Sequence, residues 1–111
     1  MDTSKFKMGW MILAFDLPTK EADERKSYTT FRRFLIEDGF HMIQFSVYAR
    51  GIISHARMQT HIRRIKMAIP AEGSIRVWYI TEAQWQRSLI YHGKPAKEIP
   101  PEDIPQQIQF W

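Results

Sequence analysis

The chain has 111 residues, a net charge of +4 and no cysteine. This length corresponds to one domain, which buries about two thirds of its unfolded surface on folding, so part of its core can be shared with a second subunit. Apolar residues make up 44% of the sequence and aromatic residues 14%, which is too many for a disordered chain. The lack of cysteine excludes disulfide bridges and thiolate metal sites.

The positive charge is concentrated in one part of the chain. No acidic residue occurs between Gly39 and Ala71, whereas this segment contains five Lys or Arg residues and three histidines. A local excess of cations attracts polyanions, so the segment is predicted to contact nucleic-acid phosphates. The apolar run after Lys7 spans about seven residues, far fewer than the ~20 that cross a bilayer. No signal-peptide cleavage site follows it, and we expect a cytoplasmic protein without a membrane partner.

The first expected strand covers residues 9–15, a continuous apolar run too short for three helical turns. It ends at Asp16, just before a turn at Pro18. A carboxylate at the edge of a core must be hydrated, hydrogen-bonded or bound to a cation. Spacing alone favours a turn residue whose side chain accepts hydrogen bonds from nearby backbone N–H groups. The second interpretation is a ligand for a hard cation.

A helix of roughly four to five turns is expected next. Thr19 is a candidate N-cap, and acidic side chains follow it where they favour the helix dipole. Tyr28, Phe31 and Leu35 recur at helical spacing, and Gly39 is expected to end the helix.

Residues 40–50 alternate with a period of two. Ile43, Phe45 and Val47 share one face, which is predicted to be packed. The other face, predicted to be solvent-exposed, carries Gln44, Ser46, Tyr48 and Arg50. Because eleven residues are long for one strand, we expect a bulge or bend near residues 44–45 to divide it.

Ser54 is expected to cap a second helix. Its apolar stripe contains Met58, Ile62, Ile65 and Ile69. Residues 74–81 alternate as another strand, and residues 82–92 are expected to begin as a helical turn and to end extended. Four prolines between Lys94 and Pro105 argue against regular structure there. We therefore predict a folded domain over 1–93 and a Pro-rich arm with a short terminal strand over 94–111.

This order of elements predicts an α+β fold with ferredoxin-like βαββαβ topology, in which two helices cover one face of a sheet. The opposite face would be left uncovered. We place Tyr48 and Trp78 on that face and expect it to form a dimer interface, since exposed apolar patches usually mark contacts.

Basic residues form rows on both expected helices. On the second helix the row contains Arg57, His61 and Arg64, with no acid within helical spacing, which favours phosphate contact over a solvated helix face. The histidine spacing does not favour a zinc site, and the common hydrolase, NTPase and dinucleotide motifs are absent. On the first helix, where both interpretations stay open, the rows pair Arg25 with Arg32 and Lys26 with Arg33.

One carboxylate cannot hold Mg²⁺, which takes about six oxygen ligands, usually from one or two acids together with water and phosphate. A two-fold axis near the strand ends would bring Asp16 and its copy together.

Four stretches of the sequence together resemble the CRISPR-associated protein 2 family, whose members partner the CRISPR integrase in spacer acquisition. The similarity spans about residues 10–92, and the sequence of these stretches is most similar to that of members from Cas9-type systems. The stretches are MILAFDLP, ADERKSYTTFRRFLIEDGF, QFSVYAR and TEAQWQRSLI.

The resemblance implies a ferredoxin-like homodimer in which the last strand of each chain can join the partner's sheet. Several family members are described as metal-dependent endonucleases acting on RNA or double-stranded DNA, and Asp16 aligns with their metal-binding aspartate. Others bridge two integrase dimers while protospacer DNA lies across them. The family often has Tyr where this chain has Phe15.

Two hypotheses follow, and whether the chain is an enzyme stays open between them. In the nuclease hypothesis, paired Asp16 carboxylates bind Mg²⁺, and Arg25, Lys26 or Arg33 neutralises developing charge. In the scaffold hypothesis, basic side chains hold the backbone of duplex DNA. We favour this hypothesis because a site with only one acidic residue from each chain is a sparse catalytic site. The predicted nucleic-acid contacts are Arg25, Lys26, Arg32, Arg33, Arg50, Arg57, Arg63, Arg64 and Lys66. The QFSVYAR stretch adds Gln44, Ser46 and Tyr48 as candidate site residues, which we call the motif-strand residues.

Overall fold

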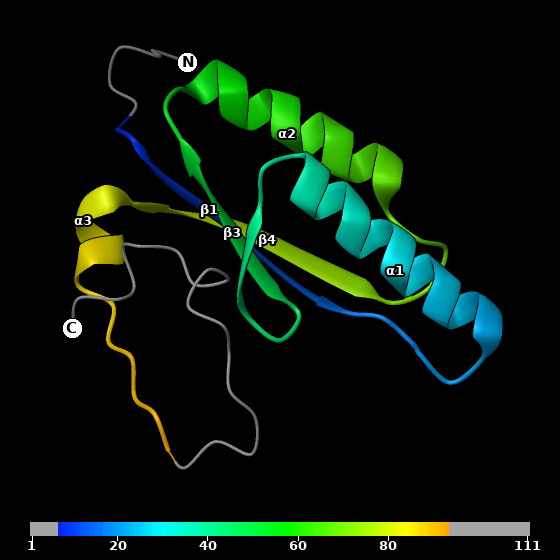
Figure 1. Cartoon of the computed structure of the whole chain (residues 1–111). Coiled ribbons are helices and arrows are strands. Elements are labelled where there is room, and N and C mark those ends of the chain that lie inside the picture. The colour runs from blue at the N-terminus through cyan, green and yellow to red at the C-terminus, as the bar shows by residue number, and fades with distance from the viewer. Residues whose placement is uncertain (1–6, 94–111) are drawn as a thin grey trace.

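The computed structural model describes residues 7–93, so the predicted arm 94–111 and its terminal strand lie outside the described residues. Within the described range, four strands form one antiparallel sheet in the order β2-β3-β1-β4. This is the ferredoxin-like βαββαβ arrangement, which confirms the predicted α+β fold (Figure 1). The elements are β1 (Gly9–Asp16), α1 (Ala22–Glu37), β2 (His41–Gln44), β3 (Val47–Ile52), α2 (His55–Ala68), β4 (Ser74–Thr81) and α3 (Glu82–Gln86).

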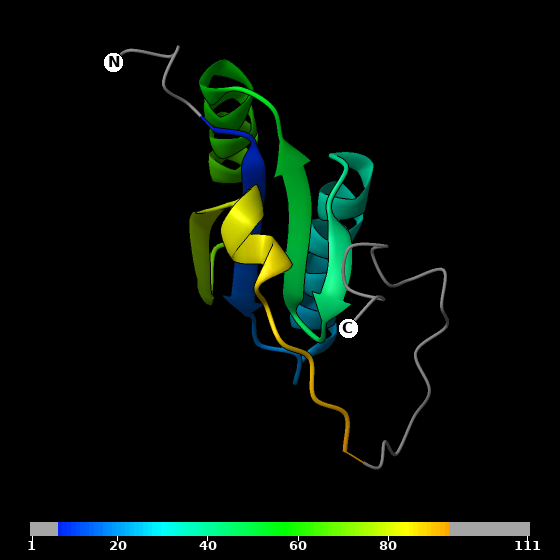
Figure 2. The same cartoon turned by 90° about the vertical axis from the view of Figure 1, so that its left-hand side faces the viewer.

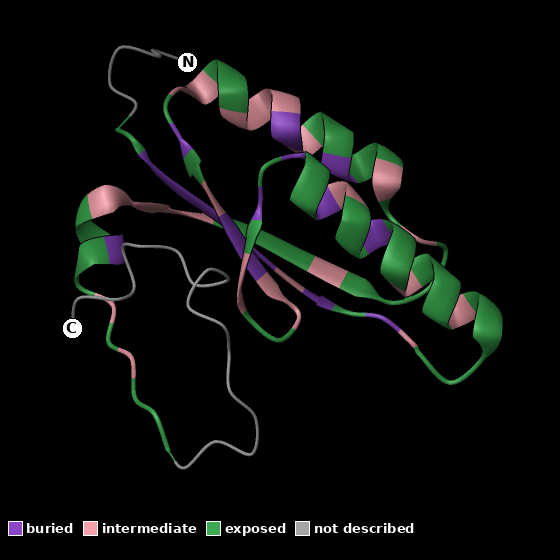
Figure 3. Ribbon diagram, in the orientation of Figure 1, coloured by how far each residue is buried: buried purple, intermediate pink, exposed green. Residues whose placement is uncertain are grey.

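The central strand β1 is packed on both faces, which explains its unbroken apolar sequence. Met11, Leu13 and Phe15 belong to the main core beneath α1 and α2, which lie side by side on one face of the sheet. Trp10 and Ile12 belong to a second cluster on the opposite face. In Figure 3 the buried residues accordingly follow β1 and the inner sides of the two helices, while the outer sides are exposed.

The face opposite α1 and α2 is partly covered by α3, so the expectation of an uncovered face was wrong (Figure 2). Trp85 of α3 stacks on Trp10 with ring centroids 4.5 Å apart. Trp10 also donates a hydrogen bond from Nε1 to Glu82 Oε2 at 2.6 Å. Trp78 lies on this face as predicted and remains 42% exposed.

Residues 40–50 are divided as predicted, with β2 ending at Gln44 and β3 beginning at Val47. The assignment of packed and exposed sides held for Ile43 and Val47, which pack against the second cluster, and for the exposed Gln44, but it was wrong for Phe45 and Tyr48. Tyr48 is only 1% exposed and packs in the main core beneath the helices, whereas Phe45 is 84% exposed in the turn. The alternation itself holds for Val47 and Tyr48, but both faces of the sheet are packed here, so a period of two could not identify the side that carries the helices.

The helix termini follow the predicted chemistry with one correction. The N-cap of α1 is Glu21 rather than Thr19, because Glu24 Oε1 accepts hydrogen bonds from the backbone N–H groups of Glu21 at 2.8 Å and Lys20 at 3.0 Å. Gly39 follows α1 with φ = +90°, as expected of a glycine that ends a helix. Ser54 caps α2, its Oγ accepting from the Arg57 N–H at 3.1 Å.

The chain after α3 has no regular secondary structure over residues 88–93, so the predicted extended segment forms no strand within the described range. Of the helices in residues 7–93, none has the length and apolar character needed to cross a membrane.

Candidate functional site

Asp16 is the last residue of β1 and lies opposite Ser74 at the start of β4. Its side chain is exposed, and its carboxylate has no hydrogen-bond or ion-pair partner among the described residues. The interpretation as a hydrogen-bonded turn residue therefore does not hold within the described range. The structure leaves this carboxylate available to water, a cation or a partner molecule.

The described part of one chain does not supply a complete metal site. It contains no group of three or more His, Asp or Glu side chains placed to hold a metal ion. A hard cation at Asp16 would thus need further oxygen ligands, such as the carboxylate of a second copy. Residues 7–93 of one chain by themselves do not fit Mg²⁺.

The turn between β2 and β3 lies beside the end of β1. The Phe15 N–H donates to the Ser46 carbonyl at 3.0 Å, and the Tyr28 hydroxyl is 3.5 Å from Ser46 Oγ. The Phe15 ring itself is buried, with the Phe31 ring edge-on at a centroid distance of 5.3 Å. Of the motif-strand residues, Ser46 thus lies beside the end of β1, and the exposed Gln44 closes the strand that leads into the same turn.

Tyr48, the third motif-strand residue, lies in the core rather than at the surface. Burial raises the pKa of its hydroxyl, and the charge and hydrogen bond of Arg32 partly oppose that shift. Part of the hydrogen-bonding capacity of Arg32 in α1 is therefore used by the buried Tyr48 hydroxyl.

The other predicted cations of α1 differ in their surroundings. Arg25 donates to the backbone carbonyl oxygens of Thr19 at 3.3 Å and Lys20 at 2.5 Å, so it braces the segment that leads into the helix. Lys26 and Arg33 are exposed, and neither forms an ion pair with a described residue.

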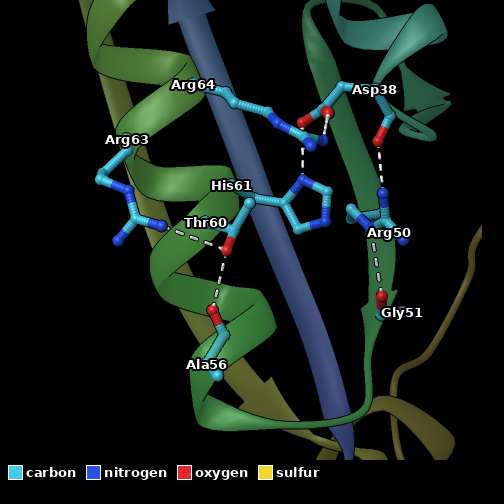
Figure 4. Close-up of polar contacts among 8 residues, drawn as sticks. All are labelled: Asp38, Arg50, Gly51, Ala56, Thr60, His61, Arg63 and Arg64. Atoms are coloured by element: carbon cyan, nitrogen blue, oxygen red, sulfur yellow. Dashed lines mark hydrogen bonds and ion pairs between the residues drawn. The ribbon is translucent and has the colours of Figure 1, made fainter.

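His61 does not belong to a surface row on α2, because it is only 1% exposed. Its Nδ1 lies 2.7 Å from Asp38 Oδ2, and the Nη1 of Arg64 lies 2.7 Å from Asp38 Oδ1. Arg50 of β3 donates to the Asp38 carbonyl oxygen (Figure 4). The sequence showed no acid within helical spacing of Arg64, and the fold supplies one from the end of α1.

The outer side of α2 is cationic. Arg57, Arg63 and Lys66 are exposed, and the helix contains no acidic residue. Arg63 donates to Thr60 Oγ1 at 3.3 Å and forms no ion pair with a described residue. A surface of this kind can neutralise phosphates without reading bases.

Comparison with known proteins identifies relatives of the whole chain. A family described as CRISPR associated protein Cas2 matches residues 8–88. The CRISPR-associated endoribonuclease Cas2 of Parvibaculum lavamentivorans is 41% identical over 102 residues, which cover 92% of this chain and 99% of that protein. Its namesake in Acidovorax ebreus is 44% identical over 85 residues, covering 77% and 83% of the two chains.

A third relative extends the similarity further. The CRISPR-associated endoribonuclease Cas2 of Flavobacterium psychrophilum is 34% identical over 108 residues, covering 97% of this chain and 92% of that protein. The relationship thus continues past residue 92, where the resemblance in the sequence was expected to stop. With a family match over residues 8–88 and relatives along nearly its full length, the chain belongs to the CRISPR-associated protein Cas2 family.

Proposed function

We propose that this protein acts in CRISPR adaptation, the acquisition of spacers, as a dimeric scaffold that binds double-stranded DNA between integrase dimers. The observation that carries the proposal is the outer side of α2, where Arg57, Arg63 and Lys66 are exposed on a helix without acids. Contacts of this kind bind phosphates independently of sequence, as a protein that handles protospacers of any sequence requires.

The arrangement of the helices extends this surface. Because α1 and α2 lie side by side, the exposed Lys26 and Arg33 of α1 belong to the same outer layer as the cations of α2 (Figure 1). The opposite face supports a dimer, since Trp78 remains 42% exposed there beside the cluster of Trp10 and Trp85. A second copy on that face would leave both helix layers free for DNA.

Replacing Arg63 and Lys66 together by alanine should weaken binding to a labelled DNA duplex. Each lost phosphate contact should reduce the slope of log K against log salt by about 0.9, which a fluorescence-anisotropy titration at several salt concentrations measures. Arg87→Ala is the control, because this exposed cation follows α3 on the other side of the sheet and should leave the slope unchanged. A slope that the double substitution does not alter would remove α2 from the interface.

The second candidate function is a metal-dependent endonuclease. The name endoribonuclease of the three relatives favours it, as does the exposed Asp16 carboxylate, which has no partner within the described part of the chain. In this case Asp16 from each of two copies would bind Mg²⁺, and the cation would polarise the phosphodiester. Arg25, Lys26 or Arg33 would stabilise negative charge on the substrate.

Asp16→Asn separates the two functions. In the scaffold, this substitution should leave duplex binding and spacer integration intact, whereas in the nuclease it should abolish cleavage of RNA or duplex DNA, measured with Mg²⁺ and with EDTA. Asp23→Asn is the matched control, because Asp23 is an exposed acid in the first turn of α1. Loss of integration in Asp16→Asn with DNA binding retained would contradict the scaffold as the biological role.

A further inference from the structure

One buried residue, Asp38, joins three elements at the end of α1. The side chain of Asp38 is only 5% exposed, and both of its oxygens are engaged, one by His61 Nδ1 and one by Arg64 Nη1, each at 2.7 Å. Its backbone carbonyl accepts from Arg50 of β3 (Figure 4). Asp38 therefore fixes both the position of α2 relative to α1 and the direction of two arginine side chains.

Positive charge exceeds negative charge at this junction. Burial lowers the pKa of the Arg50 guanidinium, the nearby Asp38 raises it, and the charges of Arg57 and Arg64 lower it again. The charges of Arg57 and Arg64 thus both act on Arg50, and Arg57 and Arg64 lie seven residues apart on one side of α2. One carboxylate cannot neutralise three guanidinium groups, so the junction favours an additional anion.

His61 is the second side chain that holds the Asp38 carboxylate. Its Nε2 is buried without a hydrogen-bond partner among the described residues, and its ring stands perpendicular to Phe40 at a centroid distance of 6.4 Å. Its Nδ1 holds one oxygen of Asp38, which leaves the other oxygen for Arg64.

Arg64 combines a fixed orientation with access to solvent. Its side chain reaches across from α2 to Asp38, and yet it is 51% exposed (Figure 4). A guanidinium held by a carboxylate through Nη1 has its position fixed while its other N–H donors remain available, and the planar group suits the two-oxygen geometry of a phosphate. Arg63, one residue earlier, points to the opposite side and has no carboxylate to orient it.

We propose that Arg50, Arg57 and Arg64 form one binding site for a DNA backbone phosphate where α1, β3 and α2 meet, and that Asp38 is the residue that positions Arg64 in it. The inference rests on the proposed DNA-binding function and assigns a particular phosphate contact within it. It also assigns a role to an acidic residue, which a simple count of charges would treat as repelling DNA.

Asp38→Asn tests this role because orientation and charge predict opposite results. Removing a negative charge should by itself tighten duplex binding, whereas loss of orientation should weaken binding about tenfold and reduce the salt slope by about 0.9. Glu37→Gln is the control, since this exposed carboxylate on the last turn of α1 is the neighbour of Asp38, and its removal should leave affinity equal or higher. Circular dichroism verifies that both variants are folded.

A second pair of variants leaves the buried carboxylate in place. Arg64→Lys keeps the charge but loses the planar donor set, so it should bind the duplex about as weakly as Arg64→Ala, while Arg63→Lys should bind like the unaltered protein. Adding Asp38→Asn to Arg64→Ala should cause no further loss, because both changes remove the same contact. Full binding by Arg64→Lys, or tighter binding by Asp38→Asn, would overturn the inference.

These outcomes are distinct from failure of the proposed function. If the unaltered protein binds no duplex in a salt-dependent manner, the scaffold function and this site fail together. If Arg63 and Lys66 contribute to binding while the Asp38 and Arg64 variants bind normally, only the site is wrong.

Discussion

Replacing Asp38 by alanine should lower the free energy of unfolding by about 3–5 kcal/mol. The substitution leaves His61 Nδ1 buried without its acceptor and removes the carboxylate that holds Arg64, both at 2.7 Å in the folded protein. The contact of Arg50 with the backbone carbonyl of residue 38 is retained, so the loss falls on the connection between the end of α1 and α2. Urea unfolding followed by far-ultraviolet circular dichroism measures the change at a fixed protein concentration.

Glu37→Ala provides the comparison for this prediction. Glu37 is also an acid near the end of α1, but it is exposed and forms no ion pair with a described residue, so its loss should change stability by less than about 0.5 kcal/mol. Asp38→Asn should fall between the two, because its single amide oxygen can still accept from His61 Nδ1 while Arg64 loses its charged partner. Equal stabilities for the two alanine variants would show that the Asp38 contacts contribute little to the fold.

Replacing Trp85 by alanine should destabilise the protein by about 3–5 kcal/mol, as for other large aromatic residues removed from a core. Trp85 is 5% exposed, is the buried residue of the five-residue helix α3 and connects it to the sheet through its stack on Trp10. Its removal would expose Trp10 and Ile12 on a face that α1 and α2 do not cover.

The control for Trp85 is Gln86→Ala, an exposed position in the same short helix. It should leave the urea midpoint nearly unchanged, although it removes a hydrogen bond of 2.7 Å from Gln86 to Glu82. A loss of less than about 1 kcal/mol for Trp85→Ala would mean that α3 covers the sheet without stabilising it.

Local patterns predicted the elements between residues 9 and 86 and their order correctly. The apolar run before Asp16, the helical spacing of Phe31 and Leu35, and the cap at Ser54 each depend on neighbours within a few residues. Their order left the ferredoxin-like topology as the economical packing, and the family match agrees with it. Residue patterns also identified α2 as the cationic helix, since its lack of acids is a property of the sequence.

The surroundings of the site residues could not be read from such patterns. The contacts of Asp38 with His61 and Arg64 join positions 23 and 26 residues apart, which no periodicity connects. A period of two separated Val47 from Tyr48 but could not tell which side the helices cover, because both sides of the sheet are packed.

The sequence by itself thus determined which segments become strands and helices and where positive charge accumulates, because these depend on residue type and short-range spacing. Only the tertiary structure decided which of those charges are tied to a carboxylate, as Arg64 is, and which acid has no partner among residues 7–93, as is the case for Asp16. The physical reason is that electrostatic pairing depends on distance in space, and packing the helices on the sheet sets that distance independently of separation along the chain.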